Sequence, residues 1–143
     1  MAITIEETLD GRGLTYIGEG ALTGQELLDA IDRVRSFGEK PHHWLFCLHD
    51  FTAMETLACS SDDIRAVAQK DKNLLALIFP AGSVIAVVTP KDHHYGLARM
   101  WQVYAEETKW ETGVFRSRIE AEQWIREQVW SGFGIKVLSL EHR

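Results

Sequence analysis

The 143-residue chain is predicted to form one α/β domain, a single mixed, mostly parallel sheet of about five strands flanked by about four helices. Three observations predict this class. Short apolar segments alternate along the chain with segments of helical periodicity. Two of the apolar segments are continuous, which is typical of central strands covered on both faces. The chain also opens with two short strand-like segments on either side of Asp10 and Gly11, a turn dipeptide that indicates an antiparallel β-hairpin.

The first half of the chain supplies the hairpin, a helix and a central strand. Residues 3–8 and 14–20 are the two hairpin strands, and residues 44–48 form a strand buried on both faces. The helix between them starts at Thr23 and Glu26, which have the spacing of a capping box. Its inward face consists of four apolar residues at helical spacing: Leu27, Leu28, Ile31 and Val34.

The second half supplies three helices that alternate with two strands. A second helix begins at Ser60 and Asp63, which repeat the capping spacing, and continues through Leu74 until Pro80 ends it. Residues 83–89 and 112–115 are strands. The third helix, between these strands, carries the clearest amphipathic pattern, made by Leu97, Ala98, Trp101, Tyr104 and Ala105. A fourth helix follows Ser117 and Glu120 and turns Ala121, Trp124, Ile125 and Val129 inward.

Four segments of residues 1–130 resemble the SpoIIAA-like family, which is related to the STAS domains of sulfate transporters and anti-sigma-factor antagonists. These segments are "EGALTGQELLDAI", "LFCLHDFT" with "SSDDIRAVA", "VIAVVTPKDHHYGLARMWQVYAEE" and "GVFRSRIEAEQWI". The resemblance implies a small mixed sheet flanked by helices that acts through protein or lipid contacts and not through catalysis. Residues 131–143 lie beyond it as a separate C-terminal tail.

Ser60 and Ser61 are candidates for a phosphorylation switch because of this resemblance. In STAS antagonists a serine at the start of the helix after the third strand accepts a phosphate within a D-S-S-G type sequence. Here Asp62 and Asp63 follow the serines, and their carboxylates would repel a phosphate that carries a charge of roughly −1.5 to −2. We therefore expect Ser60 to cap the second helix and no switch to operate.

A candidate binding surface lies where the two central strands end, since ligands of parallel sheets sit beyond the carboxyl ends of strands. Two segments would line it, and Arg99, one turn into the third helix, would reach the same surface. The candidates are Asp50, Thr52, Ser60 and Ser61 in the first segment, and Lys91, Asp92, His93 and His94 in the second. In the alternative interpretation Asp92 caps the third helix and both histidines are solvated.

Several classes of function are expected to be absent. The net charge of −6 disfavours nucleic-acid binding, which needs a basic surface. No apolar run approaches the length of a membrane span, so we expect a cytoplasmic protein without an integral membrane segment. The histidines have poor metal-ligand spacing, and no nucleophile, phosphate-loop or dinucleotide signature occurs, so we expect no metal, no cofactor and no enzyme. Those histidines are His42, His43, His49, His93 and His94.

Two functions remain open. The leading hypothesis is a non-enzymatic protein-interaction or regulatory module with an unidentified protein partner. The alternative is a carrier of an apolar small molecule or lipid, which would need an internal apolar cavity of roughly 300 Å³ or more. The apolar tail must also be covered, either as an extra strand on its own sheet or by a second copy. We expect a homodimer, with Trp130, Phe133, Ile135 and Val137 at its interface.

Overall fold

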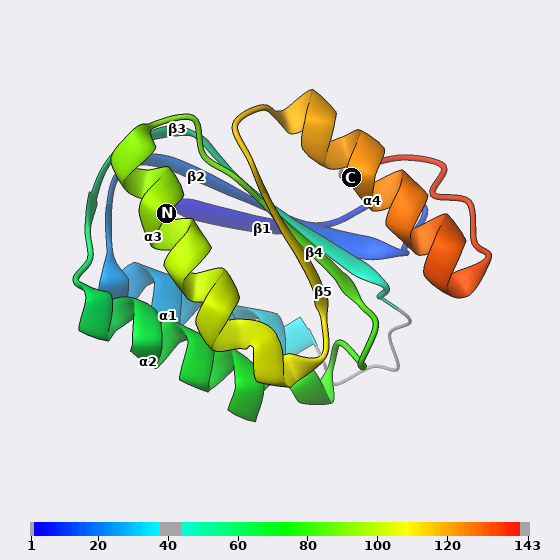
Figure 1. Ribbon diagram of the computed structural model, residues 1–143, viewed down its shortest axis with the longest axis horizontal. Helices are drawn as coiled ribbons and strands as arrows, with labels where there is room; N and C mark the ends of the chain where they lie inside the picture. The colour runs from blue at the N-terminus through cyan, green and yellow to red at the C-terminus, as the bar shows by residue number, and fades with distance from the viewer. Residues whose placement is uncertain (1, 38–43, 141–143) are drawn as a thin grey trace.

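The computed structural model describes residues 2–37 and 44–140. Within these residues, five strands form one sheet in the order β1-β2-β3-β4-β5, with β1 antiparallel to β2 and the other neighbours parallel (Figure 1). The strands are β1 Ile3–Glu7, β2 Gly13–Thr23, β3 Phe46–Ala58, β4 Val84–Val88 and β5 Glu111–Phe115. The helices are α1 Gly24–Phe37, α2 Ser61–Asn73, α3 Asp92–Tyr104 and α4 Arg118–Phe133, with short 3₁₀ turns η1 Leu75–Leu77 and η2 Ala105–Thr108. The predicted fold class and opening hairpin are confirmed.

The helices divide unequally between the two faces of the sheet. Helices α1, α2 and α3 cover one face, and α4 lies on the opposite face together with the C-terminal tail (Figure 1). Each of the first three helices connects two strands that are neighbours in the sheet. Because such parallel crossovers have one hand, a sheet with strands in sequential order receives these helices on the same face.

Two apolar clusters hold the layers together. The cluster under α1, α2 and α3 includes Leu14, Cys47 and Ile85. On the other face Phe46, Leu48 and the alternate β4 residues Val84, Ala86 and Val88 pack against α4. Consecutive residues of a strand point to opposite faces. The continuous apolar runs of β3 and β4 are therefore needed to fill both clusters at once, as the sequence predicted.

Three helices begin with the same predicted hydroxyl cap. The backbone N–H of Glu26 donates to Thr23 Oγ1 at 3.2 Å, that of Asp63 to Ser60 Oγ at 3.1 Å, and that of Glu120 to Ser117 Oγ at 3.3 Å. Each bond satisfies an N–H group that the helix itself leaves unpaired, which stabilises a helix by about 1 kcal/mol.

The main departure from the prediction is the length of β3. Its carboxyl half continues to Ala58 and pairs with β2, so the segment expected to lie beyond the strand predicted at residues 44–48 is itself a strand. Strand β4 ends at Val88 opposite Asp50, and the rest of β3 therefore forms a two-stranded ribbon with β2. Because most side chains of this half are exposed, its sequence lacks the apolar run of the buried half. Helix α2 also stops earlier than predicted, at Asn73, before the 3₁₀ turn.

The tail does not add a strand to the sheet in the residues that the structure describes. Helix α4 continues through Gly132 and ends at Phe133, and its C-cap Gly134 has a φ of 66°, the left-handed conformation that glycine adopts easily. The chain then returns along the sheet and buries Val137 and Leu140 in the α4 cluster. The tail is thus covered by its own chain.

In the described ranges, 2–37 and 44–140, no helix combines the length and apolar character required to cross a membrane. His42 and His43, two of the histidines considered above, lie outside these ranges.

Candidate functional site

The residues predicted to line one binding surface are distributed over several places. Asp50 and Thr52 lie on β3, where Asp50 faces α4 and Thr52 is exposed. One oxygen of the Asp50 carboxylate accepts the backbone N–H and the hydroxyl of Thr52, at 2.9 and 2.5 Å. The other accepts Arg118 Nη1 at 3.2 Å. These contacts hold the strand to α4.

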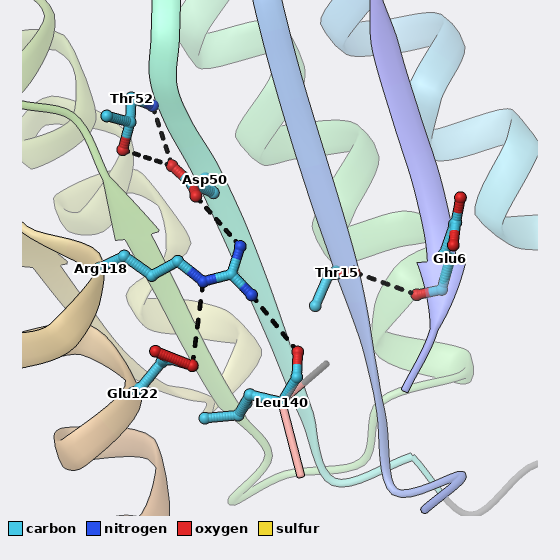
Figure 2. Close-up of polar contacts among 7 residues, drawn as sticks. All are labelled: Glu6, Thr15, Asp50, Thr52, Arg118, Glu122 and Leu140. Atoms are coloured by element: carbon cyan, nitrogen blue, oxygen red, sulfur yellow. Dashed lines mark hydrogen bonds and ion pairs between the residues drawn. The ribbon is translucent and has the colours of Figure 1, made fainter. Parts of the chain in front are cut away.

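Arg118 also joins the tail to this arrangement (Figure 2). Its Nη2 donates to the carbonyl oxygen of Leu140 at 3.3 Å, and its Nε lies 3.9 Å from a carboxylate oxygen of Glu122. On the neighbouring strands, the Thr15 hydroxyl donates to the carbonyl oxygen of Glu6 at 3.5 Å (Figure 2). Each of the three Arg118 nitrogens is therefore paired with an oxygen atom of the protein itself. Asp50 is thus part of a structural connection that fastens the tail.

Ser60 and Ser61 lie at the start of α2, where the capping box is complete. The Asp63 carboxylate accepts the Ser60 backbone N–H at 2.9 Å while the Ser60 hydroxyl accepts from Asp63. The carboxylate thus occupies the position that an anion at this helix terminus would take.

The second predicted segment forms surface contacts around α3. Lys91 Nζ donates to the Glu55 carbonyl oxygen at 2.6 Å, linking α3 to the carboxyl half of β3. Lys91 is the N-cap of α3, so Asp92 does not cap this helix, and its carboxylate instead accepts Arg116 at 2.7 Å. His93 and Arg99 are exposed, whereas His94 is buried. Of the predicted set, only His94 reaches the cavity described next.

A cavity of about 80 Å³ lies between the sheet and α1, α2 and α3. Its wall is mostly aliphatic and aromatic, with a small number of polar groups from the strands and from α2 and α3. The apolar lining comprises Leu27, Ile31, Phe51, Met54, Leu57, Ile64, Val67, Val87, Leu97, Ala98 and Trp101. The polar lining comprises Tyr16, His49, Asp71, Thr89 and His94. Apolar walls with few polar groups are typical of small-molecule sites.

Two hydroxyl groups of this wall are buried without a hydrogen-bond partner in the described chain. They belong to Tyr16 and Thr89, which are 3% and 1% exposed. The Tyr16 ring stacks on His49 with a centroid distance of 4.1 Å, which fixes its position in the wall. Because almost all buried polar groups of native proteins have a partner, these two unpaired hydroxyl groups of lining residues indicate that a partner is missing.

Asp71 of α2 brings a carboxyl group into the same wall. It is 4% exposed, and its Oδ2 accepts the indole N–H of Trp101 at 2.8 Å. Burial raises the pKa of Asp71 to about 7, while the bond from Trp101 acts in the opposite direction. Near neutral pH the carboxyl group is therefore divided between its charged and neutral forms.

The other titratable groups of the wall are neutral at pH 7. Burial lowers the pKa of His49 to about 4 and also lowers that of His94, so neither imidazole carries a charge. Burial raises the pKa of Tyr16 well above its ordinary value, and Cys47 and Asp71 add to this effect. Asp71 is consequently the lining residue whose charge can change near neutral pH.

The sequence indicates that Asp71 is buried, through the helical spacing of its apolar neighbours, although a polar side chain is normally expected at the surface. Ile64, Ala68, Asp71 and Leu75 follow one another at spacings of four, three and four residues, which is one face of a helix. An acidic residue on an otherwise apolar stripe indicates a buried carboxylate. For Tyr16 and His49 the signal is pairing, since they face each other in register on β2 and β3, and the sequence does not reveal it.

Among the described residues, no group of three or more histidine, cysteine, aspartate or glutamate side chains is placed to hold a metal ion.

Comparison with known proteins supports the fold. No protein-family model and no curated protein sequence matches the chain. Among solved structures, the chain is similar to an uncharacterized protein of the DUF3478 family from Shewanella loihica PV-4, which has a SpoIIAA-like fold. The identity is 21% and the TM-score 0.52, over 87% of this chain and 92% of the other. The SpoIIAA-like fold expected from the sequence is thereby confirmed.

Proposed function

We propose that this protein is a non-enzymatic binding module that takes up a small, mostly apolar molecule in the cavity beneath α1, α2 and α3. The observation that carries this proposal is an apolar cavity whose wall contains the buried, unpaired hydroxyl groups of Tyr16 and Thr89. A ligand with one polar group would satisfy them and leave its apolar part against the aliphatic wall.

The size of the cavity limits the ligand. At about 80 Å³ it is smaller than the roughly 300 Å³ at the lower end of drug-sized sites. A lipid chain does not fit this volume. The proposed ligand therefore has only a few carbon atoms, and the role is closer to sensing a small molecule than to carrying a lipid.

The state of the reactive groups supports a role without catalysis. Burial, assisted by the nearby Asp63, raises the pKa of Cys59 to about 11, and burial raises that of Cys47 well above its ordinary value. Both thiols stay protonated at neutral pH, and the protonated thiol is a poor nucleophile. A histidine with a pKa of about 4, such as His49, is also a weak base.

Filling the cavity should abolish binding. We expect isobutanol and xenon to cause saturable shifts of the Trp101 indole N–H signal in NMR spectra of the natural protein. Ala98→Leu, which adds carbon atoms to the wall, should remove these shifts and leave a folded protein. Ala66→Leu makes the same change at an exposed position of α2 and should bind both probes normally. Absence of saturable shifts in the natural protein, or full binding by Ala98→Leu, contradicts the proposal.

A second candidate function, protein interaction through the face that carries α4, is favoured by the exposure of apolar side chains there. Trp130 on α4 is 62% exposed and Leu138 on the tail is 74% exposed. Val137 is buried in its own chain, and Phe133 and Ile135 pack partly against the same cluster. Of the four predicted dimer residues, Trp130 therefore has the most surface for a second copy.

Trp130→Glu should convert a homodimer to a monomer, because a carboxylate in the middle of an apolar interface loses its hydration. Light scattering at tens of micromolar protein measures the change. Leu77→Glu is the matched control, since Leu77 is 84% exposed on η1, on the opposite face, and the variant should stay dimeric. A natural protein that is monomeric at this concentration rules out the homodimer.

A further inference from the structure

We propose that the ligand of the inner cavity is a small alkylammonium ion, whose nitrogen pairs with Asp71 and whose alkyl group fills the apolar space. This inference rests on the proposed function and names the chemical class of its ligand.

The first support is the situation of the Asp71 carboxylate. It lines the cavity at 4% exposure, and one of its oxygens accepts the Trp101 N–H. No lysine or arginine in the described part of the chain forms an ion pair with it. A buried carboxylate without a cation is costly to ionise, which is reflected in its pKa of about 7. An ammonium ion in the cavity supplies the missing positive charge.

The second support is the charge of the groups in and near the cavity wall. Strand β2 presents Tyr16, β3 presents Cys47 and His49, and α3 presents His94, all neutral near pH 7. On α1, the guanidinium of Arg33 acts on Tyr16 but donates to the Ile3 carbonyl oxygen at 2.6 Å and does not line the cavity. The charged Asp71 would repel a carboxylate or phosphate ligand, and no described residue that lines the cavity carries a positive charge to offset this repulsion. The wall therefore disfavours anions.

The third support is the aromatic character of the wall. Tyr16, Phe51 and Trp101 line the cavity together, and aromatic rings attract alkylammonium ions through their electron-rich faces. The hydroxyl oxygens of Tyr16 and Thr89 are unpaired acceptors for the N–H groups of such an ion. A carboxylate, hydroxyl acceptors and aromatic rings around one apolar cavity match a short alkylammonium ion in charge and hydrogen bonding.

Three isosteric probes test the ligand class: isobutylamine, isobutanol and isobutyrate, each titrated into the full-length protein and followed at the Trp101 indole N–H. We expect isobutylamine at pH 8 to bind about tenfold more tightly than isobutanol, because charge-assisted hydrogen bonds are the stronger ones. Isobutyrate should bind least. In Asp71→Asn the advantage of the amine should disappear while isobutanol still binds. Asp62→Asn removes the same charge from an exposed position of α2 and should keep the advantage.

The pH dependence of the natural protein gives a second measurement that needs no variant. Isobutylamine remains protonated from pH 8 to 5.5, so its affinity should fall over this range as Asp71 takes up a proton, whereas that of isobutanol should stay constant. Equal binding of amine and alcohol, or tightest binding of isobutyrate, overturns the ammonium inference and leaves the proposed function standing. Failure of all three probes to bind overturns both.

Discussion

Asp71→Asn is expected to stabilise the ligand-free protein by about 2 to 4 kcal/mol at pH 8, or to raise its melting temperature by about 5 to 10 °C. The pKa of Asp71 is about 7 in the folded protein, against an ordinary value of 3.8. Ionising this buried carboxylate therefore costs free energy in the folded protein, and the unfolded chain does not bear this cost. Asparagine keeps an oxygen acceptor for the Trp101 N–H and carries no charge.

The effect has a definite dependence on pH. Between pH 4 and 7 the folded protein holds a proton on Asp71 that the unfolded chain has lost, so this residue lowers stability progressively as the pH rises through that window. Above pH 7 its contribution is constant. The stability difference between Asp71→Asn and the natural protein should therefore be near zero at pH 4 and reach its full value by pH 8.

Thermal unfolding of both proteins across this range measures the difference. The comparison is necessary because His49, with its pKa lowered to about 4, stabilises the folded protein above pH 6.5 and loses this contribution as the pH falls to about 4. That trend opposes the trend from Asp71 and masks it in the natural protein alone. Asp62→Asn, at an exposed site of the same helix, should change stability by less than about 0.5 kcal/mol. A destabilised Asp71→Asn at pH 8 would show that the ionised carboxylate has a favourable partner.

Leu140→Ala is expected to reduce the free energy of unfolding by about 2 to 5 kcal/mol. Leu140 is 1% exposed and packs in the cluster between α4 and the sheet, so the substitution leaves a cavity in a closely packed core. Urea denaturation followed by tryptophan fluorescence measures the loss.

Leu138→Ala is the matched control for the tail. Leu138 is two residues earlier and is 74% exposed, although its backbone N–H donates to Asp10 Oδ2 at 3.1 Å. The substitution keeps that bond and should change stability by less than about 0.5 kcal/mol. If both variants behave alike, the tail is not packed on the sheet in solution.

Much of the fold could be predicted because its signals are local. Capping pairs such as Ser60 and Asp63, the turn at Asp10 and Gly11, and the continuous apolar run of β4 each specify an element through neighbouring residues. The carboxyl half of β3 could not be predicted in this way. It is a strand because β2 pairs with it over residues such as Ala53 and Thr56, and pairing between distant segments leaves little trace in a largely exposed stretch.

The candidate site was harder to predict than the fold for a related reason. The sequence predicted a binding site among the polar residues that follow the strands, but the Asp50 carboxylate accepts a hydrogen bond from Arg118 in the structure. The cavity instead brings together Tyr16, His49 and Asp71 from three elements that only the tertiary structure places side by side. Of the predicted binding residues, His94 alone lines it, because α3 begins at Asp92 and turns this histidine toward the sheet.

The unequal covering of the two sheet faces affects how the chain can fold during synthesis. One face has its three helices in place once α3 has been made, but the other is completed only by α4, Val137 and Leu140. Until residue 140 has emerged from the ribosome, Phe46 and Leu48 lack part of their cover and remain open to non-native contacts. Arg118 bonds both to Asp50 of β3 and to the carbonyl oxygen of Leu140, so it can complete its contacts only after residue 140 has been made.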